Sequence, residues 1–274
     1  MAASNHYRET ADYLRRRLPK FEPEILIILG SGLGFMTDKI EKPAFFPYKE
    51  IPNFKKSTAP GHRGRLAAGR LSGKNVLMME GRFHLYEGYT PEEAAFPVRV
   101  ANLLGAKNLV VTCAAGAVNK SYKVGDLVAL SDFISFTHPG PLIGFDDSEF
   151  KTRFVDMTYV FDKNFRSVAK EIAQERGFMM REGVYFYMPG PQFETPAEIR
   201  AIRTLGGDLV GMSTVQECVM AMRCSMRVAG IALVTNYGAG VLDLPISEGE
   251  VFVEAKRASA KFADFLMEYV KRME

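Results

Sequence analysis

Residues 24–34 read EILIILGSGLG, and this stretch decides the fold class. The run EILIIL follows Pro23 and is almost entirely apolar, which is typical of a strand buried inside a sheet. The glycines that follow allow a tight turn, in which backbone N–H groups can point toward an anion. A buried strand that ends in such a loop indicates an α/β protein, in which ligands bind outside the carboxyl ends of strands.

Strand and helix patterns alternate along the rest of the chain. Its 274 residues are 47% hydrophobic, which is enough for one substantial core, and we predict a single domain over residues 1–274. We expect strands at residues 24–29, 75–80, 108–112, 127–131, 184–188, 208–210 and 230–235. We expect helices at residues 7–18, 91–104, 162–176, 196–205 and 215–226, and a last one after Ser247. Ser247 and Glu250 have the spacing of a capping box, and the apolar face of this last helix begins at Val251. Residues 137–156 read as a long irregular segment, which is usually functional or faces a partner.

Composition and charge exclude several classes of protein. The net charge of +3 is spread without basic blocks, so nucleic-acid binding is not indicated. Cys113, Cys218 and Cys224 have neither a metal-binding nor a redox spacing, which favours a reducing, cytoplasmic location. The first residues carry charges where a signal peptide needs an apolar core, and no apolar run approaches the roughly 18 residues of a membrane span.

The loop at residues 30–34 is a candidate anion site, because the Ser31 hydroxyl adds a donor to its backbone N–H groups. A dinucleotide-binding loop needs G-x-G-x-x-G, whereas this loop reads G-x-G-x-G. Pro43, Pro47 and Pro52 also interrupt the helix and strand that should follow such a loop. A tight structural turn and an anion site both stay open for this stretch.

A second candidate anion site is GRFHLYEGY, residues 81–89, which follows an expected strand. Arg82 and His84 are two residues apart and therefore point to the same side. A guanidinium and an imidazole on one face suit a phosphate, and Glu87 can orient His84. Tyr86 offers a hydroxyl on the same face. The alternative is a surface Arg–Glu pair beside a packed histidine.

The stretch GPQFETPAE, residues 190–198, places a ring and a carboxylate on the loop between a strand and a helix. Thr195 and Glu198 have the spacing of a capping box, which accounts for the helix start. Phe193 then packs under the loop or faces a flat ligand, with Glu194 beside it.

Three further strands are expected to end in small or polar residues: CAAG at 113–116, VGMST at 210–214 and LVTN at 233–236. In the second, a capping box of Thr214 with Glu217 would leave Ser213 at a helix mouth. Because strand ends meet at one edge of a sheet, we predict one composite pocket. Its anion half would hold Ser31, Arg82, His84 and Ser213, and its flat half Phe193, Glu194 and Asn236.

Together these motifs closely resemble the smaller-subunit, trimeric class of purine nucleoside phosphorylases. The resemblance runs from GSGLG through PGHRGRL, GRFHLYEGY, CAAG, GPQFETPAE and VGMSTVQE to LVTN. It implies an α/β domain with a central mixed, partly barrel-like sheet flanked by helices, and a homotrimer. It also implies phosphorolysis of 6-oxopurine nucleosides such as inosine and guanosine, in purine salvage, without a metal or an organic cofactor.

The similarity further implies a role for each site residue, with His84, Glu194 and Asn236 in catalysis. Phosphate would be held by Ser31, His62, Arg82, His84, Ser213 and the backbone at Ala114. Ribose would contact Tyr86, Met212 and Glu248, and Phe154 would close the ribose site of a neighbouring subunit. The base would be lined by Phe193, Glu194, Val210, Gly211, Thr235 and Asn236. Glu248 stands where the family commonly has His, and Cys113 where it often has Asn.

Asn236 indicates the class of base, because its amide can donate to a 6-oxo group. The related methylthioadenosine phosphorylases carry Asp at that place, which would favour a 6-amino group. A nucleoside hydrolase, a nicotinamide-dependent oxidoreductase and a non-enzymatic trimeric scaffold are the competing interpretations. The hydrolase would need no anion site, and the broken glycine fingerprint disfavours the oxidoreductase.

Overall fold

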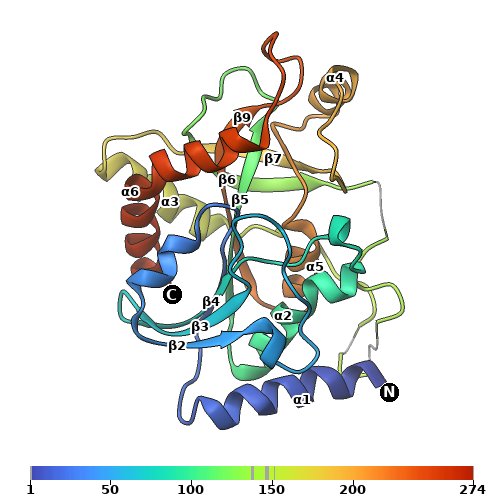
Figure 1. Ribbon diagram of the computed structural model, residues 1–274, viewed down its shortest axis with the longest axis vertical. Helices are drawn as coiled ribbons and strands as arrows, with labels where there is room; N and C mark the ends of the chain where they lie inside the picture. Colours follow the sequence, from blue (N-terminus) through green and yellow to red (C-terminus); the bar gives the residue numbers. More distant parts are fainter. Residues whose placement is uncertain (1, 137–138, 146–147, 151, 274) are drawn as a thin grey trace.

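The computed structural model describes residues 2–136, 139–145, 148–150 and 152–273, and its centre is a 9-stranded mixed sheet (Figure 1). The strand order is β2-β3-β4-β1-β5-β8-β7-β6-β9. The strands are β1 (Ile25–Ile28), β2 (Glu41–Pro47), β3 (Arg65–Leu71), β4 (Lys74–Glu80), β5 (Asn108–Ala117), β6 (Leu127–Ile134), β7 (Arg181–Tyr187), β8 (Leu209–Gly211) and β9 (Arg227–Tyr237).

Helices cover both faces of this sheet. The α-helices are α1 (Ala2–Arg17), α2 (Pro91–Leu104), α3 (Lys163–Glu175), α4 (Pro196–Thr204), α5 (Val215–Arg223) and α6 (Glu248–Arg272). Short 3-10 helices are η1 (Gly34–Lys39), η2 (Tyr48–Glu50) and η3 (Leu85–Glu87). Helices α3 and α6 lie on one face, and α2 and α5 lie on the other (Figure 1). Among the described residues, every helix is too short or too polar to cross a lipid bilayer.

Strand β1 shows why the opening stretch decides the fold. All four of its residues are buried, and it pairs in parallel with both β4 and β5. Its side chains alternate: Leu26 and Ile28 pack in the core under α2 and α5, whereas Ile25 and Ile27 pack in the core under α3 and α6. The carboxyl ends of the three parallel strands therefore meet at one edge of the sheet, as the sequence predicts.

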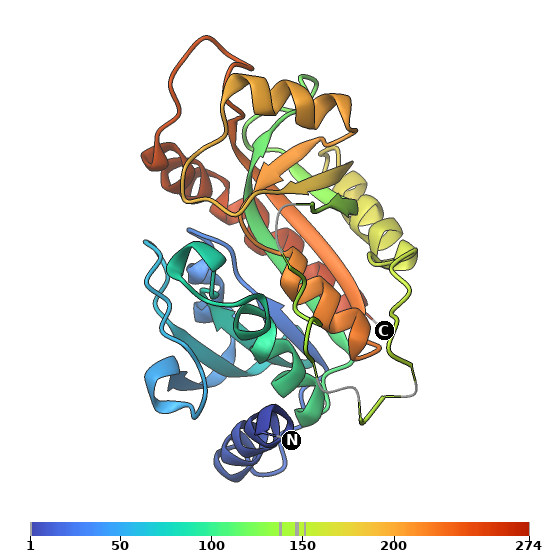
Figure 2. The same cartoon turned by 90° about the vertical axis from the view of Figure 1, so that its right-hand side faces the viewer.

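The second half of the sheet closes on itself. Strand β5 pairs in parallel with β9 along most of its length and in antiparallel fashion with β8, while β8, β7, β6 and β9 pair in turn. This closure confirms the expected mixed, partly barrel-like sheet. Figure 2 shows the strands β2, β3 and β4 (blue to cyan) at the end of the molecule opposite to the closed part.

Several expected elements differ from the observed ones. Strands β2 and β3 were not expected, because Pro43 and Pro47 interrupt β2 and because β3 mixes arginines with small residues. Strand β2 lies at the edge of the sheet, where a residue without an N–H is tolerated. Strand β5 extends to Ala117, beyond the expected end at residue 112. In residues 137–156, the described positions contain neither helix nor strand, as expected.

Candidate active site

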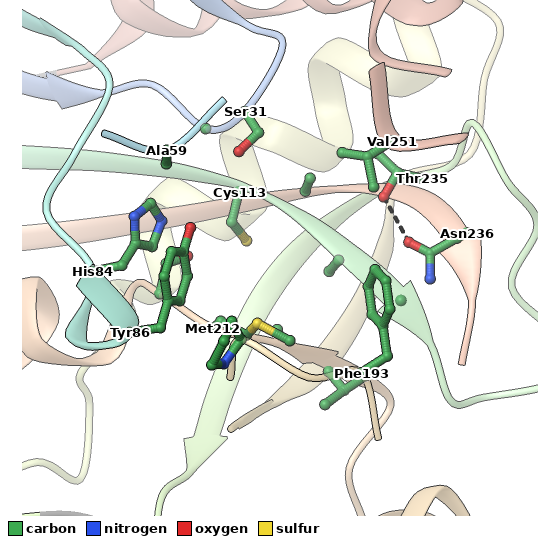
Figure 3. Close-up of a pocket in the computed structure, with 18 of the residues that line it drawn as sticks. Ser31, Ala59, His84, Tyr86, Cys113, Phe193, Met212, Thr235, Asn236 and Val251 are labelled. Carbon is green, nitrogen blue, oxygen red and sulfur yellow. Dashed lines mark hydrogen bonds between the residues drawn. The ribbon is translucent and has the colours of Figure 1, made fainter. Parts of the chain in front are cut away.

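One pocket of about 450 Å³ lies where the carboxyl ends of these strands meet. Figure 3 shows Ser31, His84 and Tyr86 on one side of it and Phe193, Thr235 and Asn236 on the other. The two predicted halves therefore face each other across a single cavity. The predicted residues that line it are Ser31, Arg82, His84, Tyr86, Ala114, Phe193, Glu194, Val210, Gly211, Met212, Ser213, Thr235 and Asn236.

The glycine loop after β1 lies close to β5. The Gly30 N–H donates to Thr112 Oγ1 at 3.0 Å. A Cβ at position 30 would lie 2.8 Å from the Cα of Cys113, so only glycine fits this close approach. The loop thereby brings the Ser31 hydroxyl to the pocket wall, beside the end of β5.

Arg82 is the cation of the anion half, and it is 2% exposed. Its Nη2 donates to the Thr112 carbonyl, and its Nη1 lies 3.3 Å from Glu217 Oε1 and 3.5 Å from Thr214 Oγ1. Glu217 is equally buried, so the two residues form a buried ion pair. The expected capping box of Thr214 with Glu217 is wrong, because Glu217 pairs with Arg82 instead.

The turn before α5 is strained. Thr214 is fully buried and has a φ of 81°, which a residue with a branched Cβ rarely adopts. The Ser213 N–H donates to the buried Tyr185 hydroxyl at 3.1 Å, which fixes the turn from below. This geometry presents the Ser213 side chain to the pocket from the mouth of α5. The expected box of Ser247 with Glu250 is also wrong, since Ser247 makes no side-chain cap of α6.

His84 is held in one tautomer. Its Nδ1 lies 3.1 Å from Glu87 Oε2, as the sequence analysis expected. Burial raises the pKa of Glu87, but hydrogen bonds from His84 and Thr58 outweigh it and lower that pKa to about 2. Burial lowers the pKa of His84 below its ordinary value, against the opposing pull of Glu87. At neutral pH the imidazole is therefore neutral, with its proton on Nδ1 and a lone pair on Nε2.

His62 packs against two residues of the anion half, His84 and Ser31. Its ring stacks on His84 at 5.3 Å between centroids, and Tyr86 stacks on the other side of His84 at 4.6 Å. His62 Nε2 lies 3.3 Å from the Ser31 hydroxyl. Burial and the neighbouring His84 and Arg82 lower the pKa of His62 to about 3, so the ring is neutral. His62 is absent from the residues that line the pocket and touches Ser31 instead.

Glu194 supplies an acceptor to the flat half of the pocket. The residue is 7% exposed, and none of the described residues donates a hydrogen bond to its Oε1. Burial raises the pKa of this carboxyl above its ordinary value. A buried carboxylate oxygen without a partner at a pocket wall is well suited to accept an N–H from a ligand. Phe193, beside it, is 40% exposed and presents its ring to the same cavity.

Asn236 supplies a donor to the same half. The Thr235 hydroxyl donates to Asn236 Oδ1 at 2.9 Å (Figure 3), and Asn236 Nδ2 donates to the Tyr237 carbonyl at 3.1 Å. These two bonds fix the orientation of the amide and leave its second Nδ2 hydrogen for a ligand. In the sheet, Gly116 of β5 pairs with Asn236 on one side and Val210 on the other.

Besides His62, two further predicted residues lie away from the pocket or outside the described residues. Phe154 is 88% exposed and does not line the pocket of its own chain. The side chain of Glu248 lies outside the described residues, although α6 begins at this position. The assigned roles of both residues stay predictions.

Several pocket residues were missed from the sequence. Val251 was expected on the packed face of the last helix, and Phe252 was not considered. Helix α6 begins beside the cavity, so both residues line it. Ala59 and Pro60 belong to the wall as well. Pro60 is the first residue of the quoted motif PGHRGRL and Ala59 directly precedes it, which was the available signal.

The fold and the pocket define a class of protein: an α/β protein whose mixed, partly closed sheet carries one composite site, with an anion-binding end opposite a flat, amide-bearing end. A family model described as the phosphorylase superfamily matches residues 24–271. The chain belongs to this superfamily.

Relatives and solved structures agree with this assignment. The chain is 46% identical over 265 residues to purine nucleoside phosphorylase 1 of Geobacillus stearothermophilus, with 97% of this chain and 96% of the relative covered. It is similar to the purine nucleoside phosphorylase of Schistosoma mansoni in complex with adenosine, with a TM-score of 0.92, 37% identity and 98% of each chain covered. For the inosine complex of that protein the TM-score is 0.89, with 36% identity and 98% and 97% of the chains covered.

Proposed function

We propose that this protein catalyses the reversible phosphorolysis of 6-oxopurine ribonucleosides and deoxyribonucleosides in purine salvage. Inosine or guanosine and inorganic phosphate would yield the free base and ribose 1-phosphate. One observation carries the proposal: Arg82 and Ser31 share a single pocket with Glu194 and Asn236. The names of the relatives support it, and so does the neighbouring structure that binds inosine.

Phosphate is the nucleophile in this proposal. One phosphate oxygen bonds to the anomeric carbon as the glycosidic bond breaks, and the bonding electrons leave with the purine. Arg82 and Ser213 hold the phosphate, and the neutral His84 accepts a hydrogen bond at Nε2 from a phosphate hydroxyl. Tyr86 and Met212 flank the ribose between the two halves. The enzyme needs no nucleophile of its own, because it positions two substrates and stabilises developing charge.

The purine leaves as an anion, and the flat half of the pocket receives it. The free hydrogen on Asn236 Nδ2 would donate to the N7 and O6 side of the base. Glu194 Oε1 would accept from N1–H and, in guanosine, from the 2-amino group. The remaining wall is lined by Phe193, Val210, Gly211 and Thr235.

The decisive test is the release of hypoxanthine from inosine with and without inorganic phosphate. Release is expected only with phosphate, and ribose 1-phosphate should form in equal amount. Release at the same rate in phosphate-free buffer, with free ribose as product, would show a nucleoside hydrolase. Failure to bind inosine at all would support a non-enzymatic scaffold.

We further propose that the reaction uses neither a metal nor an organic cofactor, since phosphate supplies both the nucleophile and the charge. Within the described residues, no group of three or more His, Cys, Asp or Glu side chains lies close enough to hold a metal ion. A cytoplasmic location is also proposed, and it is supported by Cys113, Cys218 and Cys224, which are buried free thiols.

Glu194→Gln is expected to change the pH profile of the enzyme. The ionised carboxylate accepts N1–H more strongly than the neutral acid does, so kcat/KM for inosine should fall as pH drops through the pKa of Glu194. Because burial raises that pKa, the acidic limb should lie above the ordinary value of 4.5. The glutamine variant should lose this limb and about 100-fold of kcat/KM. An acidic limb that persists in the variant would assign it to another group.

Phe154→Ala tests the proposed homotrimer. An apolar side chain that is 88% exposed and absent from its own pocket fits a contact with a neighbouring subunit. The variant should raise the KM for inosine about tenfold while leaving the KM for phosphate unchanged. Light scattering should report a trimer for the wild type.

The control for this prediction is Leu205→Ala, because Leu205 is also an exposed apolar residue but lies after α4 and does not line the pocket. It should leave both KM values unchanged. Unchanged kinetics in Phe154→Ala would refute the assigned role of this residue.

A further inference from the structure

A buried carboxylate outside the pocket joins the chain segments that carry the anion half. Glu80 is the last residue of β4, is 1% exposed and does not line the cavity. We propose that Glu80 is a positioning residue for phosphate, which fixes the loop of Ser31 and the loop of His62 relative to Arg82. The proposal rests on the phosphorolysis proposed above and adds a residue that the reaction itself does not use.

The first contact of Glu80 is with the loop that carries Ser31. Thr37 Oγ1, in η1, lies 3.2 Å from Glu80 Oε2 and 3.0 Å from the Gly34 carbonyl, so its single proton is shared between them. A Cβ at position 34 would lie 2.9 Å from Glu80 Oε1. The carboxylate therefore packs directly against the end of the glycine loop and is tied to the turn that follows it.

The second contact is with the segment that carries His62. Arg63 Nη1 lies 3.0 Å from Glu80 Oε1, and Arg65 Nε donates to Glu80 Oε2. The Gly64 N–H donates to the Glu80 carbonyl at 3.0 Å. Gly64 and Arg65 are thus hydrogen-bonded to one residue of β4, and Arg63 adds an ion pair to the same residue without a hydrogen bond.

The third connection runs along the chain to Arg82. Gly81 has a φ of 105°, and a Cβ there would lie 2.6 Å from the His62 side chain. Glu80 is therefore separated from Arg82 by one glycine that packs on His62. The segments that carry Ser31, His62 and Arg82 therefore meet at Glu80.

This convergence has a kinetic consequence. A displacement of about 1 Å in a group that positions a substrate can slow the reaction about 100-fold. Buried ion pairs add little to stability compared with apolar packing, but they can fix one geometry among several. Two guanidinium groups and one hydroxyl around Glu80 restrict the loops to the arrangement in which Ser31 and Arg82 face the same cavity.

The variant Glu80→Gln tests the proposal, because it keeps the volume of the side chain and removes the charge that holds Arg63 and Arg65. The KM for phosphate is expected to rise at least about tenfold, with the KM for inosine within about twofold of wild type. The value of kcat at saturating phosphate should also stay within about twofold. Equal changes in the two KM values, or no change in either, would overturn the proposal.

A second variant decides the question even if Glu80→Gln does not fold. Arg63 has a side chain that is 59% exposed, so Arg63→Met carries little risk for the fold. It should raise the KM for phosphate roughly threefold in the wild-type background and not at all in the Glu80→Gln background. An increase of the same size in both backgrounds would mean that Arg63 attracts phosphate directly. The proposed positioning role of Glu80 would then be refuted. No increase in the wild-type background would refute it too.

The matched control is Arg70→Met on β3, the strand that begins two residues after Arg63. Arg70 donates to the Gly73 carbonyl and pairs in register with Asn75. It should leave the KM for phosphate unchanged. Failure of the proposed function would be visible separately, because the wild type would then release hypoxanthine without phosphate.

Discussion

Replacement of Asn236 by aspartate is expected to raise the turnover of adenosine relative to inosine by about 100-fold. In the wild type, the second hydrogen on Asn236 Nδ2 can meet a 6-oxo group but not a 6-amino group. The new carboxylate would accept from a 6-amino group and repel a 6-oxo group. The ratio of kcat/KM for the two nucleosides measures the change.

The surroundings of Asn236 limit the size of this switch. The amide donates to the Tyr237 carbonyl, and a carboxylate at 3.1 Å from that oxygen would be repelled and must rotate. The change in the adenosine-to-inosine ratio of kcat/KM is therefore expected to stay below about 10⁴-fold, which is the discrimination of a site built for one hydrogen-bond pattern.

Asn236→Ala is the control, since it removes the donor without adding an acceptor. Both nucleosides should then react more slowly, with little change in their ratio. Thr235→Val would release the amide orientation and should lower inosine turnover more than adenosine turnover. An unchanged ratio in Asn236→Asp would show that this residue does not read position 6.

Arg82→Ala is expected to raise the KM for phosphate by about 100-fold or more and the KM for inosine only slightly. Each hydrogen bond to a charged group contributes about 1.5–3 kcal/mol, and the guanidinium offers more than one. The same variant leaves Glu217 as an unpaired buried charge, which should cost about 3–5 kcal/mol of unfolding free energy. Equal effects on both KM values would contradict the role of Arg82 in holding phosphate.

The double variant Arg82→Met with Glu217→Gln separates these two effects. Without the charge pair, the unfolding free energy should return to near the wild-type value, because a buried pair contributes little net stability. The KM for phosphate should stay as high as in Arg82→Ala. Urea denaturation and steady-state kinetics on the same preparations measure both quantities.

The fold was predictable where the sequence has strong local signals. The stretch at residues 24–29 is almost entirely apolar, and both its strand and the Thr195 capping box were confirmed. Strands β2 and β3 were missed, because β2 is an exposed edge strand with prolines and β3 mixes arginines with small residues. Edge strands depend on pairing with a neighbour more than on their own composition.

The candidate site was predictable as a set of strand endings but not as a network. The sequence pattern predicts Ser213 beside the start of a helix, and it predicts that Glu217 caps that helix together with Thr214. Only the packing of α5 against the sheet reveals that Glu217 pairs with Arg82, a residue 135 positions away. Val251 was likewise expected in the core. The spacing of apolar residues on a helix is the same whether a side chain packs in the core or lines a pocket.

The sequence by itself determined the chemical groups of this protein and the strand ends on which they stand, because hydrophobic period and glycine-rich turns act over a few neighbouring residues. The tertiary structure decided which of those ends face one another and which charges are neutralised underneath them. It also left Glu194 Oε1 without a hydrogen-bond donor among the described residues and fixed the orientation of the Asn236 amide. These features arise from contacts between segments that are far apart in the chain. The closed sheet sets the distances between those segments in space.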